Sequence, residues 1–111
     1  MTDGNEKKNT QFDRMLDALS NFQRRKLLVA LLEHNPQDDT PIVVSDDESE
    51  RESLKMVVEM EHMHLPKLAE YDFIEWDREN GEVKKGAKFD EIRPLLELLS
   101  RHEDELPEGW L

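Results

Sequence analysis

The chain has 111 residues, of which 27 are Asp or Glu and 15 are Lys or Arg, so its formal net charge is −12, and it contains no cysteine. This length fits one domain with a modest core, and the missing cysteines exclude disulfides and thiolate metal sites. No stretch reaches the roughly 20 apolar residues of a membrane-spanning helix, and the N-terminus lacks the apolar segment of a signal peptide, so we expect a cytoplasmic protein without a membrane partner.

The acidity of the chain has two interpretations. A DNA-binding domain normally carries a basic surface, so a charge of −12 can mean that nucleic acid is not the partner. It can also reflect adaptation to molar salt, in which carboxylates keep the surface hydrated while their repulsion is screened within ~3 Å. Because the acidic residues are spread over the chain rather than gathered in one tail, we favour salt adaptation.

The N-terminal part divides into a tail and a helix. Residues 1–10 show no apolar period and are expected to form a disordered tail, which leaves a single domain over residues 11–111. A first helix is predicted from near Gln11, and its apolar face fits either a partner copy or the intramolecular core. This face consists of Phe12, Met15, Leu16 and Leu19.

A second helix is predicted to begin at Asn21, because Ser20 and Gln23 have the spacing of a capping box. It ends before Pro36, which disfavours helical geometry at Asn35. Its broad apolar face predicts the centre of the core. The densest positive cluster of the chain lies on its first turns, which are predicted to be exposed. These cations either contact phosphates or form a solvated face: Arg24, Arg25 and Lys26.

Residues 37–50 depart from the usual pattern of a helix-turn-helix. Where the supporting helix should lie, the sequence has Pro41, β-prone residues and a run of carboxylates. We expect residues 41–44 to be extended, as a third strand of a small sheet, and Ser45 to cap a new helix.

An apolar stripe at three- and four-residue steps predicts a long helix that ends near Tyr71. Its members are Leu54, Val57, Val58, Leu65, Leu68 and Tyr71. Pro66 cannot donate a hydrogen bond to the carbonyl of His62, so we expect a kink or a new helical start near Met63. The exposed face mixes Glu59, Glu61 and Glu70 with Lys55 and Lys67, and it offers few side chains that read bases.

We expect neither an enzyme nor a metal or cofactor site. His62 and His64 are two residues apart, so on a helix they point in different directions and cannot chelate one ion unless Pro66 unwinds the turn. The sequence contains no phosphate-binding loop, nucleophile motif or paired metal ligands.

A β-hairpin is predicted directly after the long helix. Residues 73–77 (FIEWD) read as a strand, Asn80 and Gly81 supply the turn, and a second strand begins at Val83. The hairpin is locally basic, which fits contacts to phosphates or, alternatively, lysines that protect an edge strand. Its cations are Arg78, Lys84, Lys85 and Lys88.

The last predicted helix runs from near Phe89 to Ser100 or slightly beyond, with Pro94 inside the pattern. Its apolar strip is longer than a small core covers, so we predict a homodimer helix that packs beside the first helix, with intramolecular packing as the alternative. The predicted dimer interface is Phe12, Met15, Leu16, Phe89, Ile92, Leu95, Leu96 and Leu99. Trp110 is expected to dock onto the domain or its partner.

Four segments resemble the small ArsR-like winged-helix proteins of salt-loving archaea: residues 64–70 (HLPKLAE), 73–77 (FIEWD), 16–20 (LDALS) with Arg24 and Arg25, and 92–96 (IRPLL). The resemblance covers most of the chain after residue 10. It implies a mostly α fold with a small β-hairpin, a winged helix-turn-helix with a C-terminal dimerisation helix. The cysteine-based sensing of many such repressors cannot be carried over.

The resemblance also implies a DNA-binding transcription regulator, with double-stranded DNA as the partner. The residues expected toward DNA are Arg24, Arg25, Lys26, His62, His64, Lys67, Arg78, Lys84 and Lys85. The alternative is a winged-helix module that binds another protein. Cations gathered on one face would favour DNA, whereas Glu59, Glu61 and Glu70 interrupting that face would favour a protein partner.

Overall fold

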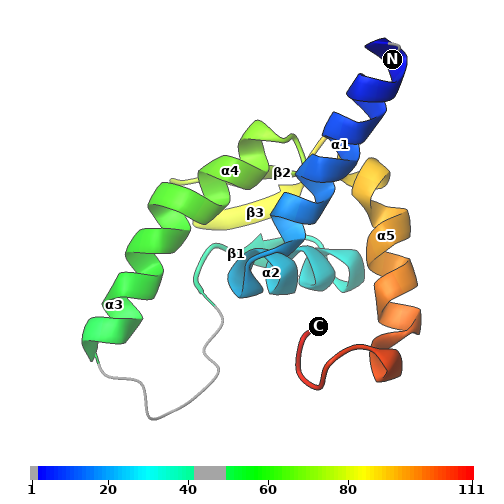
Figure 1. Cartoon of the computed structure of the whole chain (residues 1–111). Coiled ribbons are helices and arrows are strands. Elements are labelled where there is room, and N and C mark those ends of the chain that lie inside the picture. Colours follow the sequence, from blue (N-terminus) through cyan, green and yellow to red (C-terminus); the bar gives the residue numbers. More distant parts are fainter. Residues whose placement is uncertain (1–2, 42–49) are drawn as a thin grey trace.

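The computed structural model describes residues 3–41 and 50–111, with side chains described from Gln11 on. Within these residues the fold is mostly helical with a small three-stranded antiparallel sheet (Figure 1). The helices are α1 (Asp3–Leu19), α2 (Phe22–Glu33), α3 (Glu50–Glu59), α4 (Leu65–Glu70) and α5 (Phe89–Arg101), with a π-helical segment η1 (Met60–His64) and a 3₁₀ turn η2 (Glu103–Glu105). Over the described ranges, none of the helices has the length and apolar character needed to cross a bilayer.

The sheet has the strand order β1-β3-β2, formed by β1 (Gln37–Asp38), β2 (Ile74–Asp77) and β3 (Glu82–Lys85). The predicted hairpin is confirmed, with Trp76 opposite Val83. The third strand lies earlier than the predicted residues 41–44, because the side-chain amide of Gln37 donates to the carbonyls of Ala30 and His34 and so sets Gln37 opposite Val83. Residues 42–44 and the predicted cap Ser45 lie outside the described residues.

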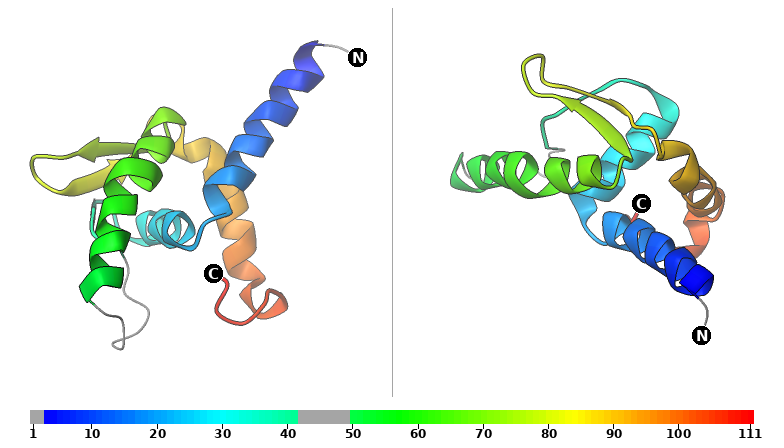
Figure 2. Two further views of the ribbon diagram at one scale, coloured as in Figure 1. Left: turned by 60° about the vertical axis from the view of Figure 1, so that its left-hand side comes forward. Right: turned by 90° about the horizontal axis from the view of Figure 1, so that it is seen from above.

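Helix α1 begins at Asp3, well before the predicted start at Gln11. The segment before Gln11 has no apolar period, but it contains no proline and several good helix formers, so it continues the helix. Figure 2 shows this N-terminal half projecting away from the rest of the molecule.

Helix α2 is capped by Asn21 rather than by Ser20, which corrects the predicted capping box. The Asn21 side-chain oxygen accepts from the backbone N–H groups of Gln23 and Arg24 at 2.9 and 3.2 Å. The Ser20 hydroxyl instead donates to the carbonyl of Asp17 at 2.7 Å, because α1 ends directly before it. Ser20 therefore belongs to the end of α1, and Asn21 begins α2.

The core is built around α2, as predicted. Leu27, Leu28 and Leu31 are buried against residues of α1, η1, α4, the hairpin and α5. The other buried apolar residues are Ala18, Leu19, Met60, Leu65, Leu68, Phe73, Ile74, Val83, Phe89, Ile92 and Leu96.

The long helix is interrupted near the predicted position. The backbone N–H of Leu65 donates to the carbonyl of Met60, five residues back, which is the π-helical pattern. Pro66 follows directly at the start of α4 and has no N–H to donate, so the regular helical ladder cannot run through this turn.

Gly86 joins the hairpin to α5. A Cβ atom at this position would lie 2.5 Å from the carbonyl oxygen of Asp72 and 2.7 Å from the nitrogen of Ile74, so only glycine fits. The close approach lets Lys88 donate its N–H to the carbonyl of Asp72, just before α5 begins.

Candidate nucleic-acid interface

The turn of the hairpin is held by Asp77 and Asn80. The Asp77 carboxylate accepts from the side chain of Asn80 at 2.7 Å and from its backbone N–H at 3.3 Å. These bonds, the side-chain one first, lower the pKa of Asp77. Gly81 then takes a positive φ of 61°, as a tight hairpin turn requires.

Arg78 connects the hairpin to the long helix. Its guanidinium lies 4.3 Å from the centre of the Trp76 ring, and its Nη2 lies 3.5 Å from the carbonyl oxygen of Glu61 in η1. The Trp76 ring is itself fixed, because its N–H donates to Asp39 at 3.1 Å. The exposed cation Arg78 is therefore held beside η1.

The two lysines of β3 differ in their surroundings. Lys84 is exposed and pairs with Glu82 of the same strand at 3.6 Å. Lys85 is half-buried, with its Nζ 5.2 Å from the centre of the Phe89 ring, and so turns toward α5. Only Lys84 shares the open surface of the hairpin with Arg78.

Helix α3 is exposed where the sequence predicts a core face. Leu54, Val57 and Val58 are 65%, 39% and 48% exposed, whereas Leu65 and Leu68 of α4 are buried. The reason is that α3 extends past the body of the molecule (Figure 1), so the core reaches the long helix only from Met60 onward. The exposed cations Arg51 and Lys55 flank this apolar surface, and Lys55 pairs with Glu59 at 3.9 Å.

Arg24 is buried, which corrects the prediction of an exposed phosphate contact. Its guanidinium donates to the carbonyls of Ala18 at 3.3 Å and Asp17 at 2.8 Å, and to the hydroxyl of Ser20 at 3.1 Å. The last carbonyls of a helix have no partner within the helix, and Arg24 supplies donors to those of α1.

Arg25 is also buried, and it serves the same helix end. It donates to the carbonyl of Leu19 at 2.8 Å and to that of Trp110 at 2.6 Å, and the Trp110 ring centre lies 4.1 Å from its guanidinium carbon. Trp110 thus docks onto its own domain, which is one of the two alternatives expected from the sequence. Lys26 donates to an oxygen of Leu111 and is half-buried. The signal that could have indicated burial is the position of the arginines just after the end of α1.

His64 and Lys67 belong to the same internal network. The Nδ1 atom of His64, which is only 4% exposed, lies 2.9 Å from the guanidinium of Arg24. The Asp17 carboxylate accepts from Lys67 and from the Tyr71 hydroxyl, both at 2.6 Å. These two bonds, Lys67 first, lower the pKa of Asp17. The network joins α1, α2, η1 and α4, and the sequence alone did not indicate it.

Three of the nine residues predicted to face DNA are exposed: His62, Arg78 and Lys84. Arg24, Arg25 and His64 are buried, and Lys26, Lys67 and Lys85 are half-buried beside a partner. The structure adds two exposed cations that the prediction left out, Arg51 and Lys55. Carboxylates accompany these cations along the helix: Glu50 and Glu52 flank Arg51, and Glu59 and Glu61 follow Lys55.

A second surface of interest is apolar and involves α1 and α5. The middle of α1 meets the first turn of α5, where the Gln11 side chain donates to Glu91 at 3.3 Å. Phe12 and Leu16 of α1 are 50% and 47% exposed, and Leu98 of α5 is 49% exposed. Such residues are available to a second copy of the chain.

Part of the predicted dimer interface is wrong. Phe89, Ile92 and Leu96 are buried in the intramolecular core, because this face of α5 packs toward α2. Met15, Leu95 and Leu99 are half-buried against the same core. A partner could therefore reach only the outer flank of α5.

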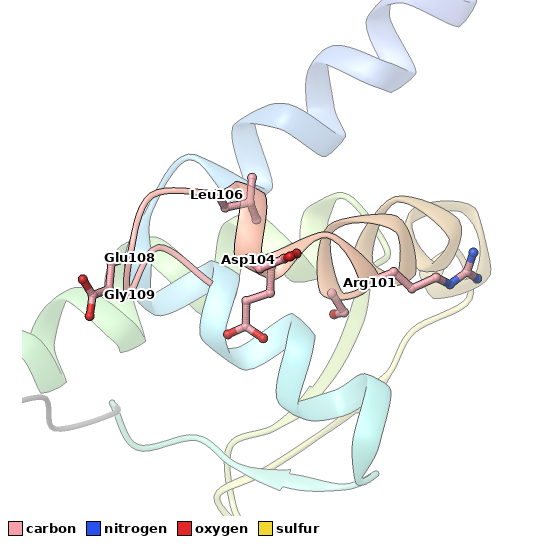
Figure 3. Close-up of a pocket in the computed structure, with 7 residues that line it drawn as sticks. Arg101, Asp104, Leu106, Glu108 and Gly109 are labelled. Atoms are coloured by element: carbon pink, nitrogen blue, oxygen red, sulfur yellow. The ribbon is translucent and has the colours of Figure 1, made fainter.

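An open depression with a volume of about 530 Å³ lies beneath the end of α5. Figure 3 shows the Arg101 side chain extending away from Asp104 and Glu108. The lining is acidic: Ser100, Arg101, Glu103, Asp104, Leu106, Glu108 and Gly109. We assign no ligand to it.

A comparison with protein families matches residues 16–84 to the model described as "Domain of unknown function (DUF7344)". The match runs from the end of α1 through α2 and the long helix into β3, so it contains the internal network and most of the hairpin. No curated protein and no solved structure matches the chain.

Proposed function

Since the chain belongs to the family described as "Domain of unknown function (DUF7344)", we propose its function from the surface that the matched residues build. We propose a winged-helix protein of the ArsR-like kind that binds double-stranded DNA in the cytoplasm and regulates transcription. In such proteins a helix enters the major groove while the adjacent hairpin contacts the sugar-phosphate backbone.

The observation that carries the proposal is the position of Arg78. The long helix runs through η1 and α4 directly into the hairpin, and Arg78 lies 3.5 Å from the carbonyl of Glu61 in η1. One duplex could then contact the exposed side of α3 and the hairpin together. Arg51 and Lys55 are the exposed cations of α3, and Arg78 and Lys84 are those of the hairpin strands and their turn, while the exposed Lys88 follows the hairpin at the start of α5. The first four replace the buried Arg24 and Arg25 as phosphate contacts.

The composition of α3 favours phosphate contacts over base reading. Between Arg51 and Lys55 the exposed residues are Glu52 and Leu54. Leu54 offers no hydrogen bond to a base edge, and the Glu52 carboxylate can only accept one. In molar salt the repulsion between phosphates and the neighbouring carboxylates Glu59 and Glu61 is screened within ~3 Å. We therefore propose binding of low sequence specificity.

Binding of a labelled duplex across a potassium chloride series tests the proposal. The logarithm of the affinity should fall linearly with the logarithm of salt concentration, and each lost phosphate contact should reduce the slope by about 1. Arg78→Ala and Lys84→Ala should each show this reduction. Arg101→Ala, an exposed arginine at the far end of α5, is the matched control and should leave the slope unchanged.

We further propose a homodimer whose interface combines α1 with the outer flank of α5. Its apolar residues are Phe12 and Leu16 of α1 and Leu98 of α5, supported by the half-buried Met15, Leu95 and Leu99. A two-fold axis would bury both copies of this surface, and the two hairpins could then contact two half-sites.

A second candidate is a module that binds another protein through α3. The exposed Leu54, Val57 and Val58 favour this function, because apolar residues on an open helix face typically mark contacts between proteins. A folded chain that binds no duplex at any salt concentration, under the assay above, would favour this second function.

A further inference from the structure

The contact between Arg24 and His64 constrains the protonation of the histidine. Arg24 is 7% exposed and His64 is 4% exposed, and the Nη1 of Arg24 lies 2.9 Å from the Nδ1 of His64. A guanidinium is always charged and has only donors. The Nδ1 of His64 must therefore accept the hydrogen bond, so the ring is neutral and its proton is on Nε2.

The same guanidinium holds the end of α1. Besides His64, it donates to the carbonyls of Asp17 and Ala18 and to the hydroxyl of Ser20. Arg24 thus joins the last turn of α1 to the π-helical segment η1, and none of these four acceptors is charged.

The charged groups around His64 come from every helix packed against it. Arg24 lies on α2, Glu59 at the end of α3, and Lys67 on α4. The carboxylate of Asp17 on α1 lies 4.0 Å from Arg24, but its other oxygen already accepts from Lys67 and Tyr71. A protonated His64 would therefore be repelled by two nearby cations, Arg24 and Lys67, and attracted only by Glu59.

We propose that His64 is a proton-controlled link between α1 and the long helix. In the neutral state it accepts from Arg24 and holds α1 against η1. When Nδ1 takes up a proton, two donors with positive charge face each other inside the fold, the contact breaks, and the last turn of α1 loses its attachment to η1. This inference goes beyond the proposed function and does not depend on DNA binding.

The direction of the titration agrees with this geometry. Burial, then Arg24, and then Lys67 lower the pKa of His64, while Glu59 raises it. The unfolded chain therefore binds a proton at a higher pH than the folded chain does. The stability that the neutral ring provides is fully present above the unfolded pKa of about 6.5, and it is lost as the pH falls below that value.

The test compares His64→Asn with His62→Asn in the full chain in concentrated potassium chloride. Asparagine places its side-chain oxygen near the position of Nδ1, so it can accept from Arg24 without titrating. His62 is the matched control, because it lies two residues away but is exposed. The readouts are the melting temperature at about pH 7.5 and about pH 5.5, and the amide exchange of residues 17–25 and 60–68.

We expect the unmodified chain and His62→Asn to lose roughly 5 °C or more between the two pH values, with both segments exchanging faster after correction for intrinsic rates. His64→Asn should lose much less. An equal loss in His64→Asn would overturn the link. Should that variant not fold, the nitrogen chemical shifts of His64 in the unmodified chain decide: a proton on Nδ1 at about pH 7.5 contradicts the proposal, and one on Nε2 alone supports it.

Discussion

Arg24 and Arg25 act together at the end of α1, because each donates to carbonyls of its last turn. Arg24 bonds to Asp17 and Ala18, and Arg25 bonds to Leu19. Replacing Arg24 would remove a donor from the buried carbonyl of Ala18, and replacing Arg25 would remove one from that of Leu19. Losing a donor at a buried oxygen costs more than the bond itself provides. Both arginines therefore have a structural role, although the sequence predicted that they contact nucleic acid.

The first prediction follows from these bonds. Arg24→Ala should lower the free energy of unfolding by about 3 kcal/mol, since it removes several charge-assisted hydrogen bonds from a buried site. Arg101→Ala, with an exposed side chain, should change it by less than about 0.5 kcal/mol. Urea unfolding at constant potassium chloride measures both, and equal effects would show that Arg24 is not anchored as described.

The second prediction concerns Asp17, whose pKa is lowered first by Lys67 and then by Tyr71. Lys67→Met should raise the pKa of Asp17 more than Tyr71→Phe does, because the lysine supplies both a hydrogen bond and a charge. Carbon NMR of the carboxyl group during acid titration measures the two shifts. The stability from this pair is present above the unfolded pKa near 3.9 and is lost as the pH falls through the lower folded value. A larger effect of Tyr71→Phe would contradict the order.

At the scale of elements, the start of α2 offers a matched pair of variants. Asn21→Ala should lower the free energy of unfolding by about 1 kcal/mol, because the N–H groups of Gln23 and Arg24 lose their acceptor. Asn21→Asp keeps an acceptor there and should restore most of that loss. Urea unfolding of the three proteins under one salt condition is the measurement. If Asn21→Ala left the free energy of unfolding unchanged, the cap would contribute nothing to stability.

The elements that the sequence predicted are those whose pattern is local. The apolar face of α2, the Asn80-Gly81 hairpin and the spacing of α5 each depend on neighbouring residues, and all three are found. A third strand was predicted, but its position at Gln37–Asp38 could not be, because Gln37 pairs with Val83, far along the chain. The same limit applies to the candidate site: His64 and Arg24 look like surface residues until α1 and η1 come together around them.

At the scale of the whole molecule, net charge governs the response to salt. With a charge of −12, carboxylate repulsion is largely unscreened in dilute buffer and should weaken the compact state. We expect circular dichroism to show incomplete or weakly cooperative folding at ~0.1 M potassium chloride and a cooperative transition at molar salt. A fully cooperative fold in the dilute buffer would remove salt adaptation as the explanation of the acidity.

The dimer proposal gives the second prediction at this scale. Phe12→Glu combined with Leu98→Glu should yield a folded monomer, because both residues are exposed in one copy and would be buried between two. Leu54→Glu is the matched control, because Leu54 is an apolar residue on α3 that is even more exposed and lies outside the proposed interface, so this change should leave the dimer intact. Light scattering at micromolar concentration and high salt measures the mass. A monomeric unmodified chain would refute the dimer and the paired half-sites.

The two tryptophans give the molecule a pair of built-in optical reporters. Each indole lies against an arginine, Trp76 with Arg78 at 4.3 Å on the hairpin and Trp110 with Arg25 at 4.1 Å on the C-terminal tail. Since a cation near the ring alters indole emission, chains that keep only one tryptophan would report on these two regions separately. A duplex that draws Arg78 toward a phosphate should change the emission of Trp76 and leave that of Trp110 unchanged. The emission wavelengths of the two single-tryptophan chains would therefore indicate which end of the protein binds nucleic acid.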